Sequence, residues 1–209
     1  MIDHLVYAVP DLAAAMDELE RDWGVRPAPG GKHEGRGSHN ALLSLGDGPY
    51  LELIARDPEQ VNVDIANHPF QLAGLVRPTL RTWAAKAPGI ADRVARARAA
   101  GYDPGTPLAM TRALPNGAGV LHWQLTRSDG ANQVGDGVVP FLIDWGGTPH
   151  PATTSPAGAK LVSLRLEHPN PGPVRDALGA LEETVEVTQG PVPALFAVID
   201  TPNGRRELR

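Results

Sequence analysis

Cysteine is absent from the 209 residues of this chain. Its absence excludes disulfide bonds, thiolate nucleophiles and thiolate metal ligands, so any metal ion must be held by histidine, carboxylate or water. The sequence also lacks an apolar run long enough to cross a bilayer, and it does not open with a basic and apolar leader. We therefore expect a cytoplasmic protein with no membrane contact.

The sequence also lacks an excess of positive charge. Nineteen basic residues stand against 24 acidic ones, for a formal net charge of −5. Basic residues do not gather with aromatic residues as they do on nucleic-acid surfaces, and Arg93, Arg96 and Arg98 recur at the spacing of a solvated helix face. We expect no nucleic-acid partner. With 42% hydrophobic and 21% charged residues, the composition is that of an ordinary globular protein.

The first part of the chain has a clear order of patterns. Ile2 to Val9 is β-branched and apolar, which predicts a strand, and apolar residues recur at helical spacing from Leu12 to Trp23. The glycine-rich residues 30–40 can hold an irregular strand. Two apolar runs around Asp47-Gly48 then predict a hairpin. Residues 1–56 thus predict a βαβββ unit.

The same order recurs later in the chain. Residues 160–168 predict a strand, residues 173–181 a helix, and Asn203-Gly204 a hairpin turn near the end. The middle third repeats the pattern more loosely, with a turn predicted at residues 115–117. We predict an α+β fold of three βαβββ modules that cover residues 1–56, 76–146 and, in partial or divergent form, 160–209.

Five segments, in the right order over about residues 1–150, resemble the glyoxalase-like domain family of the vicinal oxygen chelate superfamily. They are Asp3 to Leu12, Pro29 to His33 with Gly37 to Asn40 ("GGxH…GTxN"), Tyr50 to Ala55 ("YLELIA"), Arg112 to Gly117 with Leu121 to Trp123 ("RxxPDG…LxW"), and Val139 to Trp145 ("PFFIDW"). The chain departs from these motifs at two places. Ser38-His39 stands where the family has Thr and a variable residue, and Asn116 stands where the family has Asp. The resemblance implies curved, mostly antiparallel sheets around a small-molecule cavity.

The resemblance also implies metal ligands on the first and last strands of a unit, which here are His4 and Glu52. Laying the third unit on the first places Glu207 opposite Glu52, so His4, Glu52 and Glu207 form a candidate metal set if those units face each other. Imidazole and carboxylate suit a divalent ion such as Zn, Fe, Mn or Ni. The middle unit offers no ligand at the matching positions.

Further candidates for ligand binding lie on the glycine-rich stretch and on later strands. His33, His39 and Asn40 could contact a ligand, although a solvated surface turn explains the two histidines equally well. His122 and Trp123 alternate on one strand, so only one of them can face the cavity. Trp145 and Trp123 fit either an aromatic cavity wall or the core.

Two classes of function remain open from the sequence. One is a divalent-metal-dependent enzyme, a lyase, an isomerase or a dioxygenase, with Glu52 and Glu207 as its catalytic carboxylates. The other is a non-catalytic protein that sequesters a small molecule, as drug-resistance members of the superfamily do. Both have a small-molecule ligand or substrate as partner, and both are compatible with a homodimer.

Overall fold

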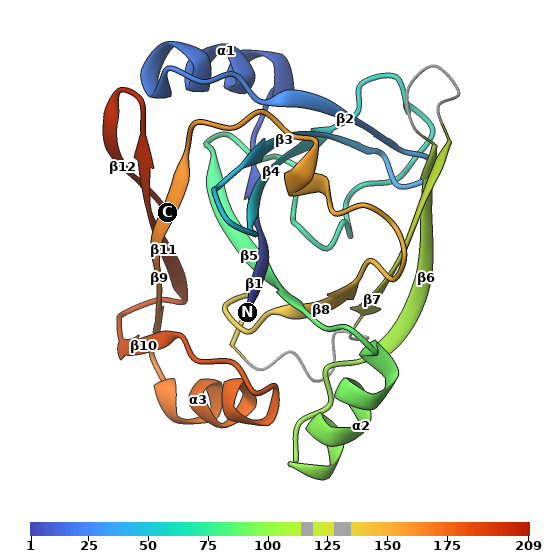
Figure 1. The fold of residues 1–209 in the computed structure, drawn as a ribbon, viewed down its shortest axis with the longest axis vertical. Coiled ribbons are helices and arrows are strands. Elements are labelled where there is room, and N and C mark those ends of the chain that lie inside the picture. Colours follow the sequence, from blue (N-terminus) through green and yellow to red (C-terminus); the bar gives the residue numbers. More distant parts are fainter. Residues whose placement is uncertain (114–118, 128–134) are drawn as a thin grey trace.

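The computed structural model describes residues 1–113, 119–127 and 135–209. The order strand, helix, strand, strand, strand occurs three times along the chain (Figure 1). The elements are β1 (Ile2–Ala8), α1 (Leu12–Trp23), β2 (Ala28–His33), β3 (Ser38–Ser44), β4 (Tyr50–Arg56), β5 (Thr79–Lys86), α2 (Ile90–Ala99), β6 (Thr106–Ala113), β7 (Val120–Arg127), β8 (Phe141–Asp144), the short 3-10 helix η2 (Pro151–Thr153), β9 (Lys160–His168), α3 (Pro171–Ala180), β10 (Glu186–Gln189), β11 (Ala194–Thr201) and β12 (Gly204–Leu208).

The first two units share one curled sheet of eight strands, in the order β2-β3-β4-β1-β5-β8-β7-β6. In each half the first strand runs parallel to the last, β1 with β4 and β5 with β8. The halves join where β1 pairs antiparallel with β5. The sheet curls until its outer strands β2 and β6 contact each other, and the resulting half-barrel has a concave inner face (Figure 1).

The third unit forms a separate four-stranded sheet with a different strand order, β10-β9-β11-β12. Its last strand, β12, pairs with β11 and not with the first strand, β9. The correspondence of Glu207 with Glu52 therefore holds along the sequence but not in space. Backbone hydrogen bonds tie this unit to the first one, from Leu161 N to Leu45 O at 3.0 Å and from Ser44 N to Pro156 O at 2.9 Å.

Helix α1 illustrates how the sequence positions these layers. Its first turn is capped by Asp11, whose carboxylate accepts a hydrogen bond from Ala14 N at 2.9 Å. It ends at Gly24, whose φ of 77° is a left-handed conformation that glycine adopts without strain. The apolar face is buried as the helical spacing predicts, at Leu12, Ala15, Met16, Leu19 and Trp23. One hydrophobic core runs from this helix through all three units.

The glycine-rich stretch holds more than the one irregular strand that its sequence predicts, because most of it forms the hairpin of β2 and β3. The turn predicted at residues 115–117, with Asn116, lies outside the described residues. Among the described helices, none has the length and hydropathy needed to span a membrane.

Candidate functional site

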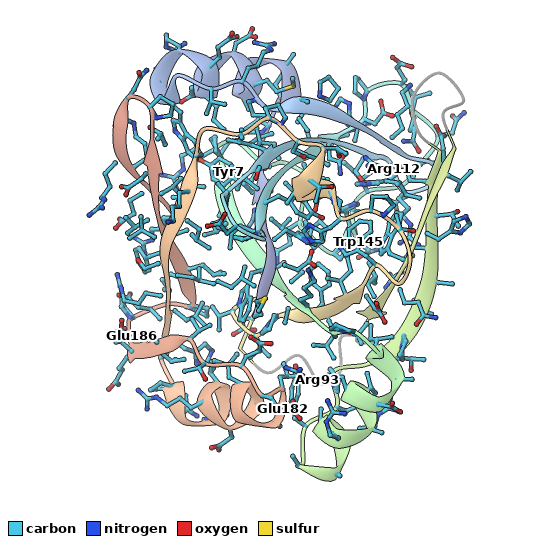
Figure 2. The ribbon with its side chains drawn as sticks, viewed as in Figure 1. Tyr7, Arg93, Arg112, Trp145, Glu182 and Glu186 are labelled. Atoms are coloured by element: carbon cyan, nitrogen blue, oxygen red, sulfur yellow. The ribbon has the colours of Figure 1, made fainter. Side chains whose placement is uncertain are left out.

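A cavity of about 1430 Å³ occupies the concave face of the eight-stranded sheet. Both halves of the sheet line it, because alternate side chains of each strand point inward. The inward residues include His4, Ser38, Asn40, Tyr50, Glu52, Thr82, Arg112, Trp123, Phe141 and Ile143. Arg112 and Trp145 lie inside the curl of the sheet in Figure 2. The connection between β4 and β5 contributes His68 and Phe70 to the lining.

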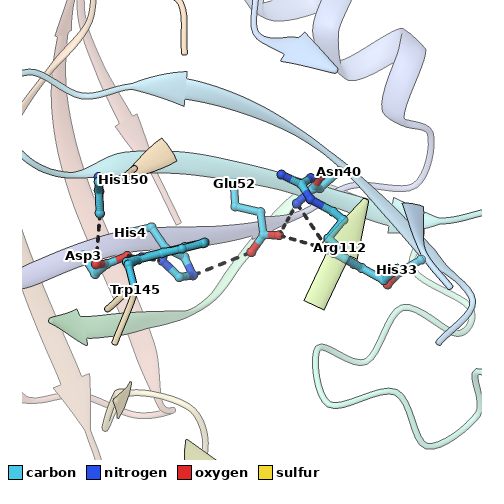
Figure 3. A network of polar contacts seen from close by, with 9 residues as sticks. Asp3, His4, His33, Asn40, Glu52, Arg112, Trp145 and His150 are labelled. Carbon is cyan, nitrogen blue, oxygen red and sulfur yellow. Dashed lines mark hydrogen bonds and ion pairs between the residues drawn. The ribbon is translucent and has the colours of Figure 1, made fainter. Parts of the chain in front are cut away.

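A fully buried carboxylate, Asp3, organises one side of this cavity (Figure 3). Its Oδ1 lies 2.8 Å from His4 Nδ1 and accepts a hydrogen bond from Trp145 Nε1 at 3.3 Å, while its Oδ2 lies 3.0 Å from His150 Nε2. Burial raises the pKa of Asp3, but the hydrogen bonds with His150 and His4 outweigh burial and lower that pKa overall. Asp3 is therefore an ionised acceptor, and the proton of His4 sits on Nδ1.

The other ring nitrogen of His4 faces the carboxylate of Glu52. Nε2 lies 3.7 Å from Glu52 Oε2, which is too long for a hydrogen bond. The ring is held in place by Tyr50, which stacks on it with 4.6 Å between ring centroids. A histidine whose Nδ1 is bound to a carboxylate and whose Nε2 is free is the usual form of a metal-ligating histidine. The donor chemistry of His4 and Glu52 therefore fits a divalent cation.

The second oxygen of Glu52 is held by an amide. Asn40 Nδ2 donates to Glu52 Oε1 at 2.6 Å, and Asn40 Oδ1 accepts from Arg112 Nη1 at 2.9 Å. These two partners fix which way round the amide lies, since a carboxylate requires a donor and a guanidinium requires an acceptor. Asn40 thus separates the negative charge of Glu52 from the positive charge of Arg112.

A chain of hydrogen bonds leads to Glu52 from the connection between β4 and β5. Phe70 N donates to His68 Nδ1 at 3.2 Å, so the proton of a neutral His68 is on Nε2, which donates to Ser38 Oγ at 3.2 Å. Ser38 Oγ also lies 2.9 Å from His33 Nδ1, and His33 Nε2 accepts a hydrogen bond from Asn40 Nδ2 at 3.3 Å. A neutral His33 therefore carries its proton on Nδ1 and donates it to Ser38 Oγ, and Asn40 Nδ2 completes the chain to Glu52. Burial lowers the pKa of His33, and it lowers the pKa of His68 to about 4, so both rings are neutral near pH 7.

The structure brings six of the predicted site residues together in the cavity lining or its walls, namely His4, Glu52, His33, Asn40, Trp123 and Trp145. His39 and His122 do not line the cavity, because side chains alternate between the two faces of a strand. Ser38 and Asn40 point inward on either side of His39, and Trp123 points inward next to His122. His122 is exposed.

Glu207 does not join His4 and Glu52. It is exposed on β12, in the other sheet, because the third unit places its last strand away from its first. Within the described ranges, no group of three or more histidine, aspartate or glutamate side chains is spaced to hold a metal ion. In the second half of the sheet, Thr82 on β5 and Phe141 and Ile143 on β8 line the cavity, and none of these three is a histidine or a carboxylate.

Sequence reasoning did not single out several residues of the site. Tyr50 and Ser38 could have been found from strand alternation, since they share the inward face with Glu52 and Asn40. His68 and His150 lie in connecting segments with no periodic signal. Asp3 precedes His4 and would be expected on the opposite face, so its bond to that ring is visible only in three dimensions.

Comparison with known proteins gives the chain its family. A family model described as a glyoxalase-like domain matches residues 2–182. A hypothetical protein from Staphylococcus aureus has a similar structure, with a TM-score of 0.68 at 13% identity over 100% of this chain and 98% of that one.

Methylmalonyl-CoA epimerases are also similar. The one from Mycobacterium tuberculosis has a TM-score of 0.44 at 18% identity, over 69% of this chain and 87% of its own. The one from Streptomyces coelicolor has a TM-score of 0.46 at 20% identity, over 72% of this chain and 98% of its own. No curated protein matches the sequence. Because the family model spans most of the chain, this protein belongs to the glyoxalase-like domain family.

Proposed function

We propose that this protein is a small-molecule enzyme of the isomerase or lyase type, which uses one divalent cation held by His4 and Glu52. The observation that carries the proposal is the pair itself. Asp3 fixes the proton of His4 on Nδ1, so Nε2 presents its lone pair toward Glu52 Oε2, 3.7 Å away. A bound divalent cation supplies a Lewis acid that withdraws charge from substrate oxygens and so favours loss of a proton from the neighbouring carbon.

The residues around the pair support proton transfer at carbon. Among the residues that the structure describes, the carboxylates that line the cavity are Asp64, Asp136 and Glu52, and of these only Glu52 is buried. A base that is shielded from water competes better for a carbon-bound proton. Asn40 holds Glu52 by Oε1 only, so Oε2, the oxygen that would ligate the cation, is also the oxygen that would accept the proton once it leaves the cation. Glu52 is therefore our candidate for the group that accepts the proton.

Aromatic residues beside the pair support an organic substrate. The ring centroids of Trp123 and Trp145 lie 5.3 Å apart. The ring centroids of Phe141 and His4 lie 5.5 Å apart, with the two rings in a T-shaped arrangement. Such aromatic surfaces bind the apolar part of a ligand and exclude water from the reacting carbon.

A second candidate function is sequestration without chemistry. The observation that favours it is that Thr82, Phe141 and Ile143 line the second half of the cavity, on β5 and β8, the first and last strands of the second unit. None of these three side chains is a metal ligand of the kind that His4 and Glu52 supply. A cavity with aromatic walls and only two ligands can bind a small molecule without activating it.

Proton exchange separates the two functions. The protein, loaded in turn with Zn, Mn, Co and Ni, is incubated in D₂O with α-hydroxy ketones and α-keto aldehydes, and loss of the C–H signal is followed by NMR. We expect exchange by the wild type and a loss of about 100-fold or more in Glu52→Gln, the range for a general base. His39→Ala, on the opposite face of β3, should exchange as the wild type does. Binding of these compounds without exchange under any metal would favour sequestration.

A further inference from the structure

Arg112 reaches the cavity across the junction of the two outer strands. It extends from β6 over β2, where a Cβ on Gly31 would lie 3.3 Å from Arg112 Cδ and one on Gly30 would lie 2.8 Å from Arg112 Nη1. The two glycines therefore leave a passage that any larger residue would narrow. This passage holds the guanidinium beside Asn40, on the side of the cavity that carries Glu52 (Figure 3).

The positive charge of Arg112 is only partly balanced there. Its one hydrogen-bond partner among the described residues is the neutral oxygen Asn40 Oδ1, and no carboxylate of those residues lies within 4.0 Å of the guanidinium. A guanidinium has five N–H donors in a planar fork, so most of them are left for another acceptor. Burial lowers the pKa of Arg112, although the charge of Glu52 raises it. A half-buried cation of this kind is best compensated by an anion that enters the cavity.

The position of Arg112 also limits where that anion belongs on a ligand. Two hydrogen bonds and the Asn40 amide separate the guanidinium from Glu52, with 2.9 Å on one side of the amide and 2.6 Å on the other. A ligand that contacts both Arg112 and the His4–Glu52 pair must therefore carry its anionic group several bonds away from the carbon that faces the pair.

We propose that the substrate is a small organic acid whose carboxylate binds to Arg112 while its oxygen-bearing carbon lies at His4 and Glu52. The inference rests on the proposed function, because it assigns a second group of the same substrate. A planar carboxylate matches the guanidinium fork in two parallel hydrogen bonds. The apolar remainder of the acid packs on Trp123 and Trp145.

The test compares 4-oxo-4-phenylbutanoate with its neutral amide by isothermal titration calorimetry. The acid combines a ketone, an aromatic ring and a carboxylate three bonds from the ketone carbon, whereas the amide has a similar shape but no charge and only one acceptor oxygen. We expect the wild type to bind the acid at least about tenfold more tightly than the amide. Arg112→Gln should abolish this preference, while Arg127→Gln, which removes another cavity-lining charge, should retain it.

Several results would overturn the inference: equal affinity for the acid and the amide, a preference that survives in Arg112→Gln, or no binding of the acid by the wild type at millimolar concentration. Circular dichroism reports whether Arg112→Gln folds. If Arg112→Gln does not fold, Arg112→Lys is tested in its place, because lysine keeps the charge but lacks the planar fork. Binding is measured with a chelator present and also in Glu52→Gln. The preference for the carboxylate is therefore tested separately from proton exchange, and the failure of one can be told from the failure of the other.

Discussion

His68 is a neutral histidine inside the hydrogen-bond chain that ends at Glu52. Burial lowers its pKa from 6.5 to about 4 in the folded protein. Between these two pH values the unfolded chain binds a proton that the folded protein does not. The contribution of His68 to stability is therefore complete above pH 6.5 and is lost as the pH falls from 6.5 to about 4.

This shift predicts a pH dependence that a single variant removes in part. Between about pH 7.5 and about pH 4.5, the wild type should lose more unfolding free energy than His68→Gln, by on the order of 1 kcal/mol after allowance for solvent screening. Urea denaturation at both pH values measures the difference. His122→Gln, exposed on β7, serves as the control and should match the wild type. Equal losses in the wild type and His68→Gln would show that His68 does not titrate in this way.

At the same scale, the sequence predicted the inward face for some residues of the cavity and missed others. His4 and Glu52 were found because a motif fixed them on strands, and alternation then fixed the face on which they lie. His39 was assigned to the ligand because the irregular strand expected in the glycine-rich stretch had no register from which its inward face could be told. The hydrogen bond from Asp3 to the neighbouring His4 ring depends on strand twist and on His150, 147 residues away in sequence, which no local pattern reports.

At the scale of elements, β2 and β6 depend on glycine where they meet. A Cβ on Gly30 would lie 2.3 Å from Asn40 Oδ1 and 2.8 Å from Arg112 Nη1, closer than real contacts allow. The first strand of the hairpin therefore needs this glycine for space, because the amide and the guanidinium already fill the volume above it.

Gly30→Ala should displace Asn40 and Arg112 and lower the unfolding free energy by about 1–3 kcal/mol, the usual cost of overpacking. Chemical denaturation measures this loss. Gly147→Ala is the matched control, since a Cβ there meets nothing within 4 Å and the residue is not in a left-handed conformation. If the two variants were equally stable, the close approach of β2 to Arg112 would not constrain the fold.

The order of elements was predictable from periodicity, but the pairing of the strands was not. Asn203-Gly204 predicted a hairpin, and β11 and β12 do form one. β12 does not pair with β9, because β10 and β11 take both sides of β9. That difference, invisible in the local pattern, is what moves Glu207 away from the cavity.

At the scale of the whole molecule, the three units share one core. Trp23 of the first unit, Trp83 of the second and Leu195 of the third belong to a single buried hydrophobic cluster. Leu80 N also donates to Arg209 O at 2.9 Å, which ties the second unit to the end of the chain. Such sharing predicts cooperative unfolding of the units together.

In urea, circular dichroism and tryptophan fluorescence should therefore follow one coincident transition. Leu195→Ala should shift both signals equally and cost about 2–5 kcal/mol, although the buried tryptophans lie in the other units. Val192→Ala, at a residue that is 50% exposed, should change little. Separate transitions, or a shift confined to one signal, would mean that the third unit folds independently.

The central claim is that His4 and Glu52 hold a divalent cation in this cavity, and elemental analysis tests it most directly. The protein is purified without chelator or affinity metal, alongside His4→Ala and the control His39→Ala. We predict about one divalent ion per chain in the wild type and in His39→Ala, and none in His4→Ala with its fold intact, because His4 is one of the two protein ligands of the proposed site. Repeated failure of the wild type to retain any supplied divalent ion would contradict the claim and leave a protein that binds its ligand without a metal.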